Sequence, residues 1–443
     1  MTDRPDPFPT SDPWVERDAA VVWHGFTQMA AYPGNAPLTV ERAEGRELID
    51  VHGRRYFDAI SSLWVTTLGH HVPELDEAII EQLGKVAHAT LLGNGSRAAV
   101  EFAEALAAVV PIADAHVLFA SDGAVAVEQA LKIAFQYWVN RGESGHHQFL
   151  ALGDAYHGDT VGALSLGDGG FGTTLFDPLR FPVLRTPGYA TEDWATKMIG
   201  AIEAHADTLA AVVIEPLVQG ASGILVAEPV DLARVGEACR SNGVLLICDE
   251  VATGFGRTGR LFASEWAGPG FRPDLMCLGK GITGGYLPLS ATVASGPVFG
   301  AFNGADLSEA TFYHGHSYGG NALACAVALR HLQLIGEWEV LANVEATAGR
   351  LSVRLGDSVA GRPGVGAIRQ RGLMAGVELD PPAGSERWGR RVCAGAVRRG
   401  VLLRPLGDVV VVMPPLTTTI DEIDRVIDVL TEAISEVWAE DAP

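Results

Sequence analysis

Two uninterrupted apolar runs restrict the fold of this chain more than any other feature of its sequence. LAAVVIEP (residues 209–216) and VLLICDE (244–250) lack the apolar–polar alternation of strands with one solvent-facing side. Such runs are typical of strands that are buried on both faces of a parallel sheet. DLARVGEACRSNG (231–243) has helical spacing and would form the crossover between them. The pattern predicts an α/β sandwich, with helices on both faces of a mainly parallel sheet.

The same alternation of strands and helices continues on both sides of these runs and sets the expected domain limits. We predict a large α/β/α domain over residues 66–334. Residues 38–60 alternate apolar and polar residues around two glycines, as in a short antiparallel meander. Together with the mixed pattern near the other end, they indicate a smaller α+β domain built from both termini, residues 20–65 and 335–443. The polar, Pro-rich segment 1–19 is expected to be a disordered lead-in.

Composition and charge exclude several classes of function. The chain of 443 residues carries 54 acidic against 32 basic side chains, and this net charge of −22 is unsuited to binding nucleic acid. Its five cysteines are scattered without a CxxC pair, which predicts no metal site, no disulfide framework and a cytoplasmic location. No apolar stretch is long enough to cross a membrane, and the N-terminus lacks the apolar segment of a signal peptide.

Two short motifs point to other enzymes, but their contexts do not fit. GDGGFG (residues 167–172) has the glycine pattern of a dinucleotide-binding turn, but the segment after it lacks helical period. GHSYG (315–319) resembles a hydrolase nucleophile elbow, between a strand-like TFYHG and a helix-like segment. That mechanism needs an acid and then a histidine after Ser317. The one histidine beyond it is His331, with no acid between them, so we reject both functions.

A lone lysine, Lys280, lies in the otherwise small and apolar segment DLMCLGKGITGGYLPLSA. The simplest interpretation is an exposed loop charge that follows a strand. However, Asp249 ends the VLLICDE run, and ligands of open α/β sheets bind beyond the carboxyl ends of strands. Both side chains would then face one crevice. A desolvated lysine is a nucleophile, and a carboxylate keeps a pyridine nitrogen protonated, so the pair predicts a site for pyridoxal 5'-phosphate.

These segments resemble the class III group of pyridoxal-phosphate aminotransferases, which have fold type I. The matching pieces span nearly the whole large domain: ASDGAVAVEQALK, AYHGDT, VVIEPLVQGASG, LLICDEVATGFGRTG and LGKGITGGYLPLSA. The resemblance implies an aminotransferase that uses pyridoxal 5'-phosphate. It also implies a homodimer with its active sites at the subunit interface.

Residue roles follow from the resemblance position by position. Lys280 would be the Schiff-base lysine, and Asp249 would be the partner of the pyridine nitrogen. Tyr156 would stack on the cofactor ring. Gly123 and Ala124 would give backbone amides to the phosphate, at the start of a helix.

The partner subunit and the substrate account for the other predicted site residues. Ser317 would reach the phosphate from the partner subunit. Arg404 would bind the carboxylate of the substrate, with a salt bridge inside the small domain as the alternative. Trp64, Phe26 and the backbone at Gly315 would line the substrate channel, although core packing is nearly as good an explanation for the two aromatic side chains.

Four further positions complete the prediction. Glu215 and Arg257 fit family positions that support the site. Asp122 replaces the serine of the commoner phosphate turn, so its side chain is expected to point away from the phosphate. Ala252 stands where most ω-amino-acid transaminases carry a bulkier residue.

Other segments are similar to one branch of the family. WHGFTQM, SSLWVTTLGHH, HGHSYGGNALACAVA and LLRPLGDVVVVMPP resemble members that transaminate 8-amino-7-oxononanoate in biotin biosynthesis. Their amino donor is S-adenosylmethionine or lysine, and the variants Phe26, Leu63 and Ser317 resemble those that use lysine. The alternative is a broader ω-amino-acid or diamine transaminase that uses pyruvate.

Overall fold

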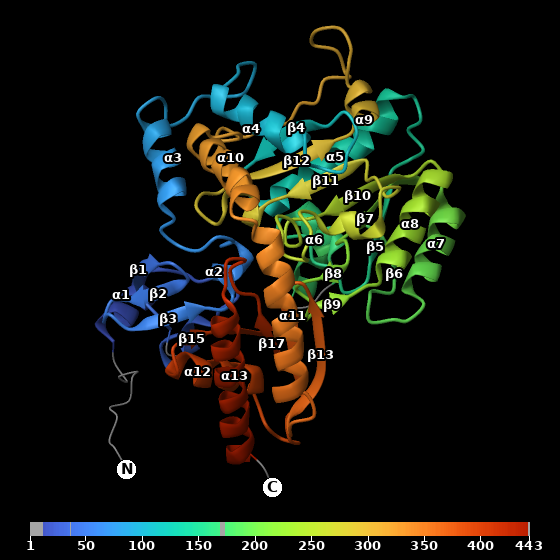
Figure 1. Cartoon of the computed structure of the whole chain (residues 1–443). Coiled ribbons are helices and arrows are strands. Elements are labelled where there is room, and N and C mark those ends of the chain that lie inside the picture. Colours follow the sequence, from blue (N-terminus) through green and yellow to red (C-terminus); the bar gives the residue numbers. More distant parts are fainter. Residues whose placement is uncertain (1–11, 36, 169–172, 442–443) are drawn as a thin grey trace.

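A seven-stranded sheet forms the centre of the larger domain in the computed structural model, which describes residues 12–35, 37–168 and 173–441 (Figure 1). Its strands, in spatial order, are β4 (His116–Ala120), β12 (Ser290–Ala294), β11 (Leu275–Leu278), β10 (Leu245–Asp249), β7 (Leu209–Ile214), β5 (Gln148–Leu152) and β6 (Leu184–Thr186). The strands from β11 to β6 run parallel, whereas β12 is antiparallel to both of its neighbours. The predicted mainly parallel sheet is confirmed.

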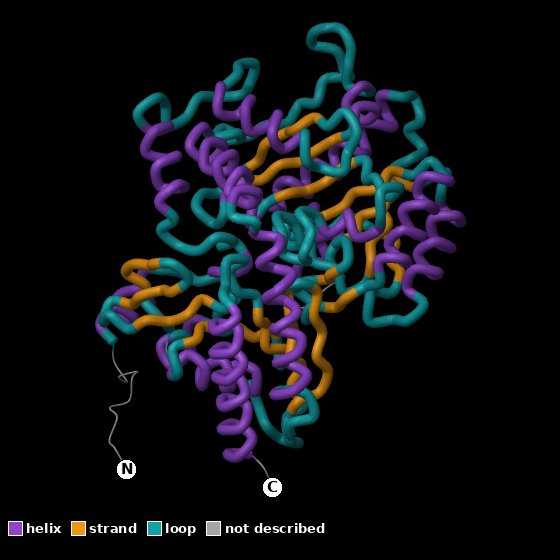
Figure 2. Tube along the Cα trace, in the orientation of Figure 1, coloured by secondary structure: helices purple, strands orange, loops and turns teal. Residues whose placement is uncertain are grey.

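Helices cover both faces of this sheet, as the purple coils around the orange strands show in Figure 2. Side chains of β10 alternate between two cores: Leu245 and Ile247 face one, and Leu246 and Cys248 face the other. The first core is closed by α5 (Gly123–Asn140), α6 (Val161–Leu166) and α9 (Gly296–Gly300). The second is closed by α3 (Pro73–Leu83), α4 (Arg97–Ala107), α7 (Trp194–His205), α8 (Pro229–Ser241) and α10 (Ala322–Glu337). Burial on both sides explains why the strand lacks polar alternation.

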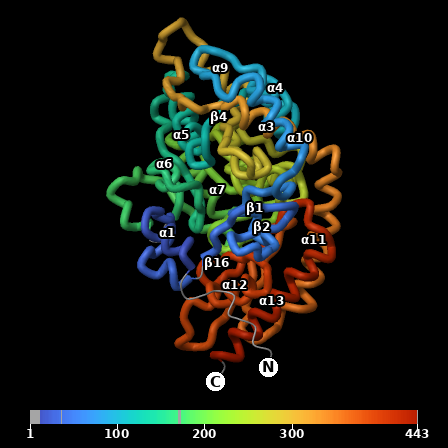
Figure 3. The backbone as a smooth tube through the Cα atoms, turned by 90° about the vertical axis from the view of Figure 1, so that its left-hand side faces the viewer, coloured from blue at the N-terminus to red at the C-terminus, as the bar shows by residue number. Residues whose placement is uncertain are grey.

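The smaller domain combines both ends of the chain. Strand β15 (Val401–Leu402) pairs in parallel with β3 (Arg55–Asp58), so a C-terminal strand completes the N-terminal meander. The meander strands before β3 are β1 (Val40–Glu44) and β2 (Glu47–Asp50). A second sheet has the order β13 (Val365–Arg371), β14 (Met374–Leu379), β17 (Val409–Val412) and β16 (Arg404–Leu406). Figure 3 shows α11 (Val340–Ser358), α12 (Trp388–Arg398) and α13 (Ile420–Asp441) packed together in this domain.

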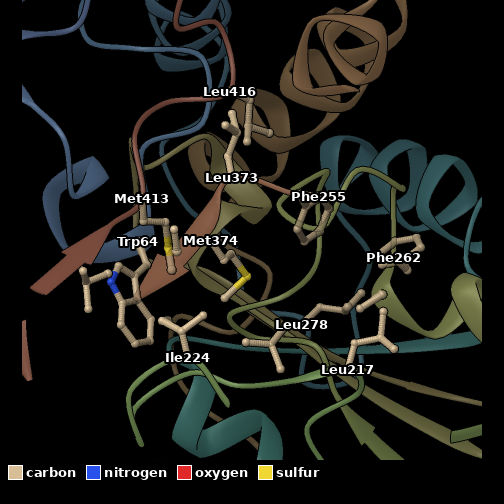
Figure 4. Close-up of a cluster of buried hydrophobic side chains, with 14 of the residues drawn as sticks. Trp64, Leu217, Ile224, Phe255, Phe262, Leu278, Leu373, Met374, Met413 and Leu416 are labelled. Carbon is tan, nitrogen blue, oxygen red and sulfur yellow. The ribbon is translucent and has the colours of Figure 1, made fainter. Parts of the chain in front are cut away.

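The two domains share a continuous apolar core at their junction. Figure 4 shows side chains from both domains in this core, among them Trp64, Met413, Leu416, Phe255 and Leu278. The buried Arg257 crosses the junction: its Nη1 donates to the carbonyl oxygen of Pro414 at 2.6 Å, and its Nη2 donates to that of Thr66 at 2.7 Å. These bonds fix both chain ends against the large domain.

The N-terminal segment contains more structure than the sequence predicts. Residues 1–11 lie outside the described part, but helix α1 (Pro13–Val21) begins inside the stretch 1–19 that was expected to be disordered. The Asp12 side chain accepts a hydrogen bond from the Trp14 amide, and proline suits the first helical turn. Among the described residues, no helix combines the length and apolar composition that crossing a bilayer requires.

Several short elements connect the larger ones. They are α2 (Ser61–Trp64), η1 (Met29–Ala31), η2 (Pro33–Asn35), η3 (Thr173–Leu179), η4 (Ala263–Ala267), η5 (Lys280–Thr283), β8 (Val218–Gln219) and β9 (Leu225–Val226). Two of them, α2 and η5, carry side chains of the site described next. Two residues separate α2 from the end of β3, and one residue separates η5 from β11.

Candidate active site

A cavity of about 450 Å³ opens beyond the carboxyl ends of β5, β7, β10 and β11. Six of the residues predicted to bind the cofactor or the substrate line it: Trp64, Gly123, Ala124, Tyr156, Asp249 and Lys280. Glu215, Ala252 and His157 line it as well. Asp249 and Lys280 meet there because β10 and β11 are adjacent parallel strands, with Asp249 paired to Cys277. The expected crevice beyond the strand ends is therefore present.

Asp249, the last residue of β10, is held by two hydrogen bonds. Its Oδ1 accepts from the Val251 amide at 3.0 Å, and its Oδ2 accepts from His157 Nδ1 at 2.7 Å. An ionised carboxylate only accepts, so the proton of this second bond lies on the imidazole. Burial disfavours a charged imidazole, but the hydrogen bond and charge of Asp249 outweigh it and raise the pKa of His157. His157 thus fixes the direction in which the carboxylate faces the cavity.

Lys280 begins η5, separated from β11 by one residue, and has a positive φ of 45°. Its Nζ lies 5.0 Å from the centroid of the Trp64 ring, within the range of a cation–π contact. Burial lowers the pKa of the Lys280 amine, while the Asp249 and Glu215 carboxylates oppose that shift. An amine of lowered pKa holds more of its neutral form, which is both a nucleophile and a proton acceptor.

Glu215 follows β7 and supports the wall of the cavity. Its Oε1 accepts from the Tyr156 amide at 3.0 Å, and its Oε2 accepts from the Gly220 amide at 3.1 Å. Burial raises the pKa of this carboxyl to about 7, with the charge of His157 acting against the shift. The Tyr156 hydroxyl donates to Asp159 at 3.0 Å, so the tyrosine is held at both its amide and its hydroxyl.

The start of α5 forms a cradle for an anion. The Asp122 side chain accepts from the Val125 amide at 3.1 Å, as a helix N-cap, and the residue lines the cavity. Its orientation away from a bound phosphate stays a prediction. A Cβ at Gly123 would lie 2.5 Å from Val251 Cγ1, so only glycine leaves this approach open. Gly123 and Ala124 line the cavity at the helix start, where the first backbone amides have no partner within the helix.

Pyridoxal 5'-phosphate fits this set of groups. The cavity offers an amine, a carboxylate and a helix start, which match the aldehyde, the ring nitrogen and the phosphate of that molecule. His157 Nε2 is buried and has no hydrogen-bond partner among the described residues. Within them, the imidazole therefore bonds Asp249 through Nδ1 alone. The residues thus provide one partner for each reactive part of the cofactor.

Four predicted site residues do not line the cavity of this single chain. Phe26, Gly315 and Ser317 lie on the exposed surface, and their roles stay predictions. Arg404, on β16, is also exposed and forms no ion pair with any residue in the described ranges. The alternative of a salt bridge inside the small domain is therefore not observed.

The structure describes one of the two rejected motifs in full, GHSYG, and it does not form a hydrolase site. The strand expected at TFYHG (311–315) is irregular chain, so GHSYG lacks the strand–turn–helix of a nucleophile elbow. His331 is buried in α10, where its Nε2 lies 2.6 Å from the Thr67 hydroxyl, while Ser317 is exposed. Of the glycine motif at 167–172, residues 169–172 lie outside the described part.

Sequence reasoning missed the role of His157. The residue stands in AYHGDT directly after Tyr156, and that segment was used only for its aromatic ring. Its partner Asp249 is 92 residues away in the chain. A histidine beyond the carboxyl end of β5, two strands from β10 in the same parallel sheet, was the available signal.

The fold and the site define a pyridoxal-phosphate-dependent enzyme of fold type I. The chain matches the family model of class-III aminotransferases over residues 29–434, and it belongs to that family. An adenosylmethionine-8-amino-7-oxononanoate aminotransferase of Nitratidesulfovibrio vulgaris is 44% identical, over 95% of this chain and 81% of the relative. The enzyme of the same name from Anoxybacillus flavithermus is 41% identical, over 96% of each chain.

Solved structures agree with the family assignment. The crystal structure of an adenosylmethionine-8-amino-7-oxononanoate aminotransferase from Methanocaldococcus jannaschii has a TM-score of 0.92 and 37% identity, and covers 96% of this chain and 98% of that one. An omega transaminase from Pseudomonas jessenii in complex with PMP has a TM-score of 0.90 and 29% identity, and covers 98% and 100%. The fold is thus common to aminotransferases with different substrates.

Proposed function

We propose that this aminotransferase transfers an amino group to 8-amino-7-oxononanoate and so forms 7,8-diaminononanoate in biotin biosynthesis. The observation that carries the proposal is the identity of 41–44% over at least 95% of the chain to relatives named for this reaction. Omega transaminases of the same fold share 28–29%. Ala252 lines the cavity with a small side chain, in agreement with the first group.

Each residue of the cavity would have a separate role in amino transfer. Pyridoxal 5'-phosphate, when bound, supplies an electron sink for a carbanion. Gly123 and Ala124 would hold its phosphate, Asp249 would keep its ring nitrogen protonated, and Tyr156 would stack on the ring. The Lys280 amine would hold the cofactor aldehyde, and its neutral form would accept a proton at Nζ and return it.

The substrate carboxylate needs a cation at the far end of the molecule, and Arg404 suits that role. Its guanidinium is exposed and pairs with no carboxylate of the described residues. Its strand, β16, follows shortly after β15, which pairs with the segment that leads to Trp64. Replacing Arg404 by methionine should raise KM for 8-amino-7-oxononanoate more than it lowers kcat, because the lost contact is distant from the reacting atoms.

The protein acts as a cytoplasmic homodimer in this proposal. Ser317 and Gly315 lie on an exposed surface together with the apolar side chains of Leu92, Tyr313 and Tyr318. Adjacent exposed apolar side chains of this size favour a subunit interface, across which Ser317 would complete the partner's site. Light scattering of the purified chain measures the mass. Mixed dimers of Lys280→Ala and Ser317→Glu chains should regain part of the activity that each lacks alone.

One spectroscopic experiment tests the proposed function and names the donor. The purified protein is scanned for the cofactor bands of the aldehyde and amine forms, first alone and then with S-adenosylmethionine or lysine. Loss of the aldehyde band with one donor identifies it, and 8-amino-7-oxononanoate should restore that band. The names of the relatives favour S-adenosylmethionine, and the variants at Phe26, Leu63 and Ser317 favour lysine.

Two controls separate the proposal from its alternative. Lys280→Ala should abolish turnover, and continued turnover would remove Lys280 from the mechanism. A protein that ignores 8-amino-7-oxononanoate but converts putrescine or β-alanine with pyruvate would be the broader ω-transaminase.

A further inference from the structure

Residues 61–64 form one turn of left-handed helix, and we call this segment the left-handed turn. The φ angles of Ser61, Ser62, Leu63 and Trp64 are 49°, 46°, 67° and 71°. L-amino acids avoid this conformation because Cβ approaches the following carbonyl oxygen, and they usually visit it as single residues. Four consecutive residues without a glycine persist there only when their surroundings determine the conformation.

The carboxylate of Asp58 holds the left-handed turn. Its Oδ1 accepts from the Ser62 amide at 3.0 Å, and its Oδ2 accepts from the Ser62 hydroxyl at 2.7 Å. His70 Nε2 lies 3.0 Å from the same Oδ2. Asp58 is fully buried and ends β3, where it pairs with Leu402 of β15, so the carboxylate is itself fixed. The backbone of the small domain thereby determines the conformation of Ser62.

The left-handed turn determines where the Trp64 ring lies. The ring lines the cavity, and Lys280 Nζ lies 5.0 Å from its centroid. Gly220 faces the ring, and a Cβ there would be 3.0 Å from Trp64 Cζ3. In Figure 4 the indole lies in the shared apolar core below Met413, whose carbonyl oxygen accepts a hydrogen bond from the Ser61 hydroxyl at 2.7 Å. The ring therefore has one well-packed position as long as the turn keeps its shape.

We propose that Asp58 is a positioning residue for amino transfer: by holding the left-handed turn, it keeps the indole face of Trp64 over the Nζ atom of Lys280. Asp58 itself does not line the cavity, so it acts through Trp64. Asp249 and Glu215 are the carboxylates that act on Lys280 directly, and both belong to other strand ends. The inference rests on Lys280 being the reactive lysine, as proposed above.

The test measures Lys280 separately from turnover. The full-length protein is freed of cofactor, incubated with pyridoxal 5'-phosphate over a range of pH and reduced with borohydride, which fixes the cofactor on the lysine that bound it. Peptide mapping then locates the label. The chain has four lysines, Lys85, Lys132, Lys197 and Lys280, so the assignment is unambiguous. The readouts are the pH midpoint of Lys280 labelling and kcat/KM.

Asp58→Asn and Trp64→Ala should shift the labelling midpoint in the same direction. Each should also lower kcat/KM about ten-fold or more, because a small displacement of a site group has a large effect on rate. The double variant should behave like Trp64→Ala alone, since Asp58 acts through the indole. Ser62→Ala removes one of the bonds to Asp58 and should give a smaller shift in the same direction. If Asp58→Asn does not fold, Ser62→Ala still tests the positioning role.

Asp50→Asn is the matched control. Asp50 is also buried in the meander, where its Oδ2 accepts from Arg54 Nε at 2.7 Å and from the Tyr56 hydroxyl at 3.0 Å. It makes no contact with the left-handed turn, so its loss should lower thermal stability and leave the midpoint unchanged. Additive effects of Asp58→Asn and Trp64→Ala, or an unchanged midpoint in Asp58→Asn, would overturn the positioning role. Labelling of another lysine in the unaltered protein would instead refute the proposed function.

Discussion

At the scale of single residues, Glu215 links the stability of the protein to pH. Its pKa is about 7 in the folded chain against an ordinary value of 4.5. A carboxyl with a raised folded pKa contributes stability that is fully present below pH 4.5 and is lost as pH rises through about 7. We expect Glu215→Gln to reduce this loss of stability with rising pH by a few kcal/mol. Denaturant unfolding of the cofactor-free protein measures it. Parallel stability curves for the two proteins would show that Glu215 has no raised pKa.

His157 supports Asp249, and this role predicts an effect on cofactor binding. His157→Leu would leave Asp249 Oδ2 buried without its donor, at a cost of about 1–3 kcal/mol in the free energy of unfolding. We also expect weaker binding of pyridoxal 5'-phosphate, measured by absorbance titration. His146→Leu is the control, because His146 Nδ1 bonds the Leu209 carbonyl oxygen at 3.0 Å outside the cavity. That variant should lose stability and keep its affinity for the cofactor.

The sequence identifies some of these residues and not others, for a physical reason. Asp249 and Lys280 were found because each ends an apolar run, and parallel strands bring their carboxyl ends together. The role of His157 depends on one hydrogen bond to a residue 92 positions away, and that of Asp58 depends on two bonds to Ser62, whose backbone has a rare conformation. No local pattern reports such a bond, because it depends on the packed positions of both side chains.

At the scale of elements, the start of α5 depends on a glycine. A Cβ at Gly123 would lie 2.5 Å from Val251 Cγ1, so Gly123→Ala should force the helix start and the loop after β10 apart. We expect a loss of about 1–3 kcal/mol in stability and weaker cofactor binding. Val251→Ala in the same chain removes the clashing methyl groups and should restore most of both. Without such recovery, the clash would not be the cause.

Element prediction succeeded where the pattern is regular and failed where it is not. The strands at β7 and β10 and the helix α8 form as expected, because their burial sets a simple period. The left-handed turn has no sequence signal, since its residues are ordinary ones in a rare conformation. Four such residues carry about 1–2 kcal/mol of strain each, which only tertiary contacts offset. The segment TFYHG has strand-like residues, but it pairs with none of the described strands and stays irregular.

At the scale of the whole molecule, Arg257 joins the two domains. It bonds the carbonyl oxygens of Pro414 and Thr66 from a fully buried position. Arg257→Met would leave both oxygens without donors, so we expect a loss of about 3 kcal/mol or more. Calorimetry should then show the small domain unfolding at a lower temperature than the large one. Arg260→Met, an exposed change in the same loop, should leave the transition nearly in place. A single unshifted transition in Arg257→Met would argue against this role.

The pairing of β15 with β3 has a consequence for synthesis on the ribosome. The meander leaves the exit tunnel early, but its partner strand is translated more than 340 residues later, since Val401 pairs with Phe57. Domains usually fold as units while the chain grows. Here the large domain, whose strands have all been translated by Ala294, should fold first. Until β15 is translated, β3 lacks that partner on one side. Hydrogen exchange on stalled nascent chains would detect that order: the Phe57 amide, which bonds the Gly400 carbonyl oxygen at 2.9 Å, should gain protection only once the last hundred residues have emerged.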